Sequence, residues 1–358
     1  MPLIDLETST GPGGFRYTLS TPADANAEAI VQGTPTLVLI HPIALGSEMF
    51  HPIYADPRLR RFNLLTMDLR GHGSTSATVD PHTYGRETAA KDVLHLMDTL
   101  KIPASHLMGV SMGSCIALQM AIFAPERVLS ICMFSPLPLI EPSEVMAGRQ
   151  EIWDCWMEAF SNPQNVDSLA LKDAMIGGLQ GTWNNCQTNL SKVLTAKTVP
   201  DIIRNWAPKN YGLFHGVAVN FFLNRPPHPV ESLGRIHCPL AVVHCSEDLP
   251  YPIHHAQELL NLLQSAGVDA QLFTIDDAPH YGNVTHFEEA NDLLYEFFLA
   301  NSKGTTLPPV PPSVESPFLA DLVRLGLQQD DEESDSDGDS SLTGKVLNLS
   351  RADARDRD

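Results

Sequence analysis

The stretch at residues 106–121 reads HLMGVSMGSCIALQMA: an apolar run, then Gly109-Val-Ser111-Met-Gly113, then helix-forming residues. This order predicts a strand, a sharp turn with Ser111 at its apex, and a helix. The residues two positions before and after such a serine must be small, as both glycines are. The turn lifts the hydroxyl clear of the sheet, and the Met112 N–H points from the helix start toward whatever the serine attacks. Taken alone, the pattern also fits a glycine-rich turn in any α/β protein.

Other apolar runs of strand length occur on both sides of this stretch and alternate with helical patterns. Continuous apolar runs are typical of strands that are buried on both faces of a parallel sheet. The alternation predicts an α/β fold with a mostly parallel, doubly wound sheet. Two short extended segments near the start, at residues 3–4 and 15–20, are expected to form an edge hairpin. The apolar runs lie at residues 36–41, 62–68, 128–134, 239–245 and 271–275.

The alternation stops between residues 136 and 235, where only helical patterns remain. All four tryptophans lie in this segment. We expect a helical lid inserted into a core formed by residues 1–135 and 236–300. Trp153 and Trp156 are candidate substrate-binding residues, with a role in the interior of the lid as the alternative.

The composition changes again after Asn301. Residues 307–312 are rich in proline, and residues 330–339 form an acidic run. We expect residues 301–358 to be a stiff linker and a disordered acidic tail that a protein partner could bind. The alternative for residues 318–325 is a short amphipathic helix.

The bulk composition excludes several classes of function. The net charge is −20, from 23 basic and 43 acidic residues, which disfavours binding to nucleic acid and to anionic membrane surfaces. No apolar run approaches the ~20 residues of a transmembrane helix, and the first residues lack the pattern of a signal peptide. The six cysteines are scattered, as in a reducing compartment, so we expect a cytoplasmic protein without disulfides. His254 and His255 have no further ligands at useful spacing, so we expect no metal site.

An acid and a histidine follow later strands of the predicted sheet. Asp248 comes shortly after the run at 239–245, and His280 comes after the run at 271–275. The ends of parallel strands share one edge of a sheet, where Ser111 also lies. A serine becomes a nucleophile when a histidine takes its proton and a carboxylate holds that histidine. Glu247 is the alternative acid, and the imidazole of His41 is expected to brace a loop.

Together, these landmarks resemble the α/β-hydrolase fold of lidded esterases, lipases and lactonases. The resemblance implies that Ser111 is the nucleophile, Asp248 the acid and His280 the base, with no cofactor. It also implies an oxyanion hole formed by the backbone N–H groups of Ile43 and Met112. The landmarks are His41-Pro-Ile43, Asp68-Leu-Arg-Gly-His-Gly-Ser74, Gly109-Val-Ser-Met-Gly113, Cys245-Ser-Glu-Asp248 and Pro279-His280.

The chain departs from this resemblance at Pro42, where members of the family usually carry glycine. Proline has no N–H to donate, whereas the Ile43 N–H remains available. We expect a serine hydrolase that cleaves a small to medium apolar ester, thioester or lactone through an acyl-enzyme. A carbon–carbon bond hydrolase of the same fold is one alternative. A catalytically silent binding protein on this scaffold is the other.

Overall fold

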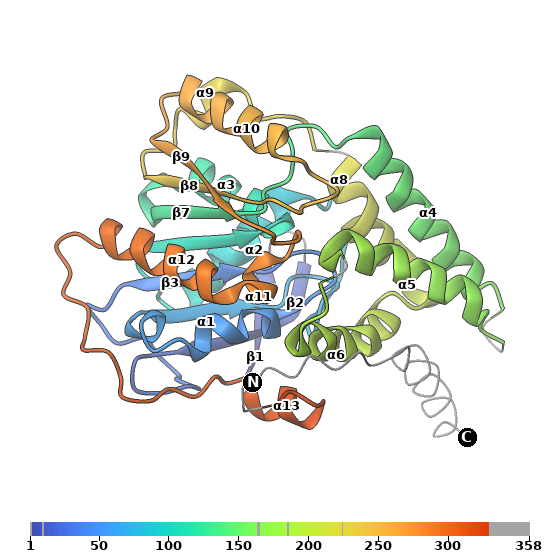
Figure 1. The fold of residues 1–358 in the computed structure, drawn as a ribbon, viewed down its shortest axis with the longest axis horizontal. Helices are drawn as coiled ribbons and strands as arrows, with labels where there is room; N and C mark the ends of the chain where they lie inside the picture. Colours follow the sequence, from blue (N-terminus) through green and yellow to red (C-terminus); the bar gives the residue numbers. More distant parts are fainter. Residues whose placement is uncertain (1, 9–10, 163–164, 185, 224, 329–358) are drawn as a thin grey trace.

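A nine-stranded sheet runs through the molecule (Figure 1). The computed structural model describes residues 2–8, 11–162, 165–184, 186–223 and 225–328. The strands follow the order β1-β2-β4-β3-β6-β7-β8-β9, and β5 pairs with β2. The pairs from β4 to β9 along this order are parallel, which confirms the predicted parallel sheet. The strands are β1 (Leu3–Thr8), β2 (Gly11–Ser20), β3 (Thr36–Ile40), β4 (Asn63–Met67), β5 (Ser76–Ala77), β6 (Ser105–Val110), β7 (Val128–Phe134), β8 (Leu240–Cys245) and β9 (Ala270–Ile275).

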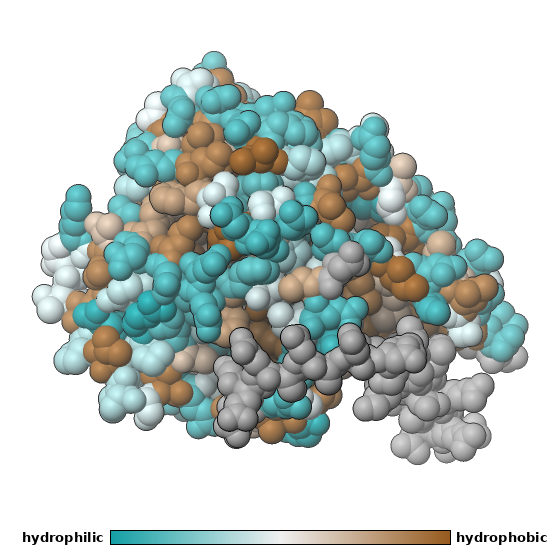
Figure 2. Space-filling model, in the orientation of Figure 1, coloured by the Kyte–Doolittle hydropathy of each residue, from teal (hydrophilic) through white to brown (hydrophobic). Residues whose placement is uncertain are grey.

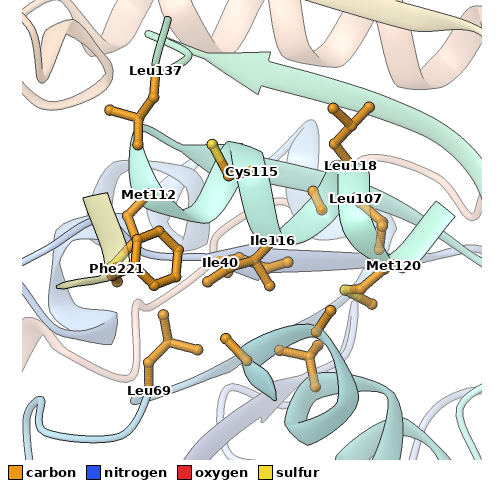
Figure 3. Packing of buried hydrophobic residues seen from close by; sticks show 14 of the residues in the cluster. Ile40, Leu69, Leu107, Met112, Cys115, Ile116, Leu118, Met120, Leu137 and Phe221 are labelled. Atoms are coloured by element: carbon orange, nitrogen blue, oxygen red, sulfur yellow. The ribbon is translucent and has the colours of Figure 1, made fainter. Parts of the chain in front are cut away.

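The central strands are apolar throughout because both faces of the sheet are covered. Successive side chains of a strand point to opposite faces, so each strand serves two cores. In β3, Val38 and Ile40 belong to one buried cluster, and Leu37 and Leu39 belong to the other. Figure 3 shows part of the first cluster, in which Ile116, on the helix that follows Ser111, lies beside Ile40 of β3.

Helices cover both faces of the sheet. Buried residues of α2, α3 and α10 belong to the first cluster, and those of α1 and α12 belong to the second. In Figure 1, α1 and α12 lie in front of the sheet and α2 lies behind it. The helices are α1 (His51–Ala55), α2 (Arg86–Thr99), α3 (Met112–Phe123), α10 (Ile253–Ser265), α11 (Gly282–Thr285) and α12 (Phe287–Asn301).

The expected edge hairpin is present, but its first strand is longer than the apolar residues suggest. β1 and β2 pair antiparallel from Leu3 to Thr8, and β1 lies at the edge of the sheet. The glycines at 11–14 do not divide the strands; they are part of β2. Gly13 lies against β5, and a Cβ at this position would come within 2.4 Å of the Ala77 Cβ. The glycines permit the close approach of a third strand, which the sequence pattern does not reveal.

Between β7 and β8, the described residues form helices and no strand. In Figure 1, α4, α5, α6 and α8 gather at the right of the view, whereas α9 lies at the top beside α10. None of the helices in the described part of the chain is long and apolar enough to cross a membrane. On the face seen in Figure 2, apolar side chains reach the surface in several separate places. The inserted helices are α4 (Ser143–Ala159), α5 (Ser168–Trp183), α6 (Asn189–Asn205), α7 (Tyr211–Phe214), a π-helical turn (His215–Asn220), α8 (Phe221–Leu223) and α9 (Val230–Leu233).

The C-terminal segment at 303–328 corrects the expectation of a free linker and tail. Phe318 and Leu322 are fully buried in the second core cluster, and residues 319–324 form the short helix α13 (Leu319–Arg324). The Phe318 ring meets Tyr54 edge to face, with centroids 5.1 Å apart.

Arginines of the core hold the backbone of this segment. The Arg61 Nε donates to the Pro308 carbonyl at 2.6 Å, and the Arg60 Nη1 donates to the Glu315 carbonyl at 3.0 Å. A proline-rich segment makes no internal hydrogen bonds, so its carbonyl groups are free for such donors. The acidic run at 330–339, part of the tail that a protein partner could bind, lies outside the described residues.

Candidate active site

Ser111 occupies a strained turn between β6 and α3. Its φ is 52° and its ψ is −111°, a conformation that an L-residue adopts only when its surroundings enforce it. Both flanking glycines are required by close contacts. A Cβ at Gly109 would come within 2.1 Å of the Gly113 carbonyl oxygen, and a Cβ at Gly113 within 2.1 Å of the Ile40 carbonyl oxygen. The sequence pattern therefore has a direct steric cause.

The structure brings Ser111, His280 and Asp248 into one hydrogen-bonded chain. The Ser111 Oγ lies 2.8 Å from the His280 Nε2, and the His280 Nδ1 lies 2.6 Å from the Asp248 Oδ2. All three residues are buried, with exposures of 1%, 5% and 4%. A neutral His280 with its proton on Nδ1 donates to Asp248 and accepts from the Ser111 hydroxyl. This is the arrangement in which a histidine can take the serine proton.

Two neighbouring loops hold the acid and the histidine. The loop after β8 and the loop after β9 are joined by a backbone hydrogen bond from the Glu247 N–H to the Ala278 carbonyl, at 2.9 Å. The second carboxylate oxygen of Asp248 accepts the Tyr251 N–H at 3.2 Å. Both oxygens of Asp248 are thus engaged. Glu247, the alternative acid, is exposed at the surface.

The two candidate oxyanion donors flank Ser111 from different elements. Met112 is the first residue of α3, where backbone N–H groups lack partners within the helix. Ile43 lies in the loop after β3. Its carbonyl accepts the Leu45 N–H at 3.0 Å and the Tyr281 hydroxyl at 3.1 Å. The residue after His280 therefore supports the loop that contains Ile43.

His41 braces the same loop, as expected. Its Nδ1 donates to the Pro42 carbonyl at 2.7 Å, and its Nε2 accepts the Leu69 N–H at 2.8 Å. These two bonds require a neutral ring with the proton on Nδ1. Burial lowers the pKa of His41 to about 4, which is consistent with this state.

An apolar cavity of about 160 Å³ lies between the inserted helices and the core. Trp156 lines it, whereas Trp153 does not and packs against Phe214, with ring centroids 4.9 Å apart. Ile43, the candidate oxyanion donor, and Tyr281, the residue after His280, line the core side of the cavity. The other aromatic lining residues are Trp183, Trp206 and Phe214.

Sequence reasoning missed Trp183 and Trp206. The available signal was the concentration of tryptophans in residues 136–235, but nothing local separates those that line the cavity from Trp153. The Trp183 ring meets Tyr281 edge to face, with centroids 5.4 Å apart. The cavity wall therefore contacts the loop that holds His280.

Within the described ranges, no three His, Cys, Asp or Glu side chains gather in a way that could hold a metal ion. His254 and His255 lie with their rings 3.9 Å apart, as neighbours on α10.

Comparisons with known proteins are consistent with this geometry. A family model described as the alpha/beta hydrolase fold matches residues 35–287. Two relatives are dihydrolipoyllysine-residue acetyltransferase components of an acetoin cleaving system. The relative from Cupriavidus necator is 34% identical over 29% of this chain and 27% of that protein. The relative from Pseudomonas putida is 25% identical over 74% of this chain and 63% of that protein. The matches thus span less than two thirds of either relative.

A solved structure extends the likeness to the fold. The enol-lactonase from Burkholderia xenovorans LB400 superimposes with a TM-score of 0.63 and 19% sequence identity. The match covers 83% of this chain and 100% of that chain. At this identity the likeness concerns the fold alone.

Proposed function

This chain belongs to the alpha/beta hydrolase fold family, and from that premise we propose that it is a serine hydrolase that cleaves a carboxylic ester, thioester or lactone through an acyl-enzyme. The observation that carries the proposal is the buried chain of hydrogen bonds from Ser111 through His280 to Asp248. The substrate class of the enol-lactonase is compatible with this chemistry.

In the first half-reaction, the Ser111 Oγ attacks the substrate carbonyl while the His280 Nε2 takes the hydroxyl proton. Asp248 stabilises the imidazolium that forms. The carbonyl oxygen becomes an oxyanion, and the N–H groups of Ile43 and Met112 are suited to bind it. When the tetrahedral intermediate collapses, His280 gives its proton to the leaving alcohol or thiol, and an acyl group remains on Ser111.

In the second half-reaction, water takes the place of the leaving group. The His280 Nε2 takes a proton from this water, whose oxygen attacks the acyl carbonyl. Collapse of the second intermediate returns the proton to the Ser111 Oγ and releases the carboxylic acid. A lactone would follow the same steps, with the leaving alcohol still attached to the acyl group.

The cavity supports an apolar substrate of limited size. Its volume of about 160 Å³ is close to the ~150 Å³ of an engineered apolar cavity that binds benzene. A substrate group of about one six-membered ring fits this volume. We also propose that residues 136–235 act as a lid over a core formed by residues 1–135 and 236–300.

Hydrolysis of a graded panel of p-nitrophenyl acyl esters by the full chain tests the proposal. Ser111→Ala, His280→Ala and Asp248→Asn should each lower kcat by about 10⁴-fold. Glu247→Gln, on the exposed neighbour of Asp248, is the matched control and should stay near the wild-type rate. Wild-type protein that cleaves no ester in the panel, or a Ser111→Ala variant that keeps its rate, would overturn the proposal.

A further inference from the structure

A second cluster of largely buried charged side chains contacts the loop after β8, which contains Asp248. Glu141 is 5% exposed, and both of its carboxylate oxygens are engaged. Its Oε1 accepts the Arg149 Nε at 2.8 Å and the Tyr251 hydroxyl at 2.7 Å. Its Oε2 lies 3.2 Å from the Arg225 Nη2. The Arg149 Nη2 closes the cluster by donating to the Tyr251 hydroxyl at 2.9 Å.

These side chains come from three separate places in the chain. Glu141 lies in the connection from β7 to α4, and Arg149 lies on α4 itself. Arg225 follows α8, near the end of the inserted segment, and its Nη1 also donates to the Pro138 carbonyl at 2.6 Å. Tyr251 lies in the loop after β8. One carboxylate therefore joins both ends of the inserted segment to the loop of the acid; Figure 1 shows α4 and α8 on the same side of the sheet.

Tyr251 connects this cluster to the candidate active site. Its backbone N–H donates to the Asp248 Oδ1 at 3.2 Å, and its ring lies 5.3 Å from the His280 ring between centroids. Its hydroxyl is held by Glu141 and Arg149, while its main chain holds Asp248. Burial raises the pKa of Tyr251, so the hydroxyl remains a donor to Glu141.

Glu141 is the residue whose loss should disturb the cluster most, because its carboxylate compensates two positive charges. Its carboxylate pairs with two guanidinium groups, those of Arg149 and Arg225, and among the described residues no other carboxylate pairs with either; the Arg225 side chain is 5% exposed. Removing one partner of a buried ion pair is strongly destabilising, because it leaves an uncompensated buried charge. The Arg149 guanidinium also stacks on the Phe222 ring, with its carbon 3.5 Å from the centroid, so a displaced Arg149 would pull on α8.

We propose that Glu141 is a positioning residue that, through Tyr251, fixes the orientation of the Asp248 carboxylate and ties it to the seating of the inserted helices. The inference rests on the proposed function, because an orientation of Asp248 matters only if His280 acts as a base. Glu141 touches no reacting atom in this account.

Steady-state kinetics with p-nitrophenyl acetate, whose acyl group is too small to fill the cavity, test the inference. Tyr251→Phe removes only the hydroxyl and keeps the ring and the N–H. We expect Tyr251→Phe and Glu141→Gln to lower kcat between about 10-fold and 10²-fold with little change in KM, as for a misplaced catalytic group. Glu144→Gln, an exposed neighbour on the first turn of α4, is the matched control and should leave kcat unchanged.

Combining these variants with Asp248→Asn separates positioning from general damage. If Glu141 acts through Asp248, then Glu141→Gln should cost nothing further in the Asp248→Asn protein, because the two effects are not additive. An equal loss in both backgrounds would overturn the inference, and so would a full wild-type kcat in Tyr251→Phe. The proposed function is judged separately by Ser111→Ala, which must abolish turnover whatever Glu141 does. Tyr251→Phe retains every buried charge, so it keeps the test open even if Glu141→Gln fails to fold.

Discussion

Replacing Phe318 with alanine should destabilise the whole hydrolase fold. This side chain is fully buried and packs edge to face on Tyr54, which is fully buried as well. Phe→Ala in a packed core costs about 3–5 kcal/mol, because apolar contact is lost and a cavity remains. Each kcal/mol lowers the Tm of a domain of 150–250 residues by about 2–4 °C, and the effect becomes smaller with size. With about 2 °C per kcal/mol for this larger domain, we expect Tm to fall by roughly 6–10 °C.

Thermal unfolding followed by circular dichroism, with a urea titration beside it, measures this change. Val323→Ala on the same short helix is the matched control. Val323 is 38% exposed, so its Tm should change by only about 1 °C. A chain that ends after Gln328 should unfold like the full chain, whereas a chain that ends after Ser302 should be strongly destabilised. A Tm for Phe318→Ala within about 2 °C of wild type would refute the docked arrangement of residues 303–328.

Three further predictions follow from local geometry. Between pH 7 and pH 5, the free energy of unfolding should fall by about 2 kcal/mol for each buried histidine whose pKa is lowered as that of His41 is. The folded pKa of His41 is about 4 and its unfolded pKa is ~6.5, so the unfolded state binds a proton first as the pH falls. Equal urea midpoints at both pH values would contradict this prediction. Met175→Trp should fill the cavity and lower kcat/KM about 10-fold for hexanoate but not acetate esters, whereas Ile176→Trp, 44% exposed on the same helix, should do neither. Gly109→Ala should lower the rate of ester hydrolysis at least about 10²-fold, because the added Cβ would clash with the Gly113 carbonyl. Gly148→Ala, which has open space around it, should retain full activity. Equal rates in the two variants would count against the strained turn at Ser111.

The sequence predicts the parts of this molecule that depend on local pattern. The sharp turn at Ser111 is predictable because its two glycines are required by contacts within a few residues and with the neighbouring strand β3. The parallel strands are predictable because strands that are buried on both faces appear in the sequence as continuous apolar runs. The meeting of Asp248 and His280 with Ser111 is predictable because the carboxyl ends of parallel strands share one edge of the sheet.

The features that the sequence did not reveal depend on contacts between distant segments. The proline-rich residues at 307–312 have the composition of a linker, and the helix that was the alternative for residues 318–325 shows no partner in its own sequence. Its place follows from the contact of Phe318 with Tyr54 and from the bonds that Arg60 and Arg61 donate to this segment. The Glu141 cluster joins residues more than a hundred positions apart, and no spacing rule connects them. Likewise, helix periodicity alone does not tell that Trp183 meets Tyr281 while Trp153 faces Phe214.

The central claim is that Ser111 is a nucleophile activated by His280. Intact-protein and peptide mass spectrometry after treatment with a fluorophosphonate probe tests it most directly. The account predicts one adduct per chain, on the peptide that contains Ser111, with labelling strongly slowed in His280→Ala and absent from heat-denatured protein. An unlabelled native chain, or an adduct on another serine while Ser111 remains free, would contradict it.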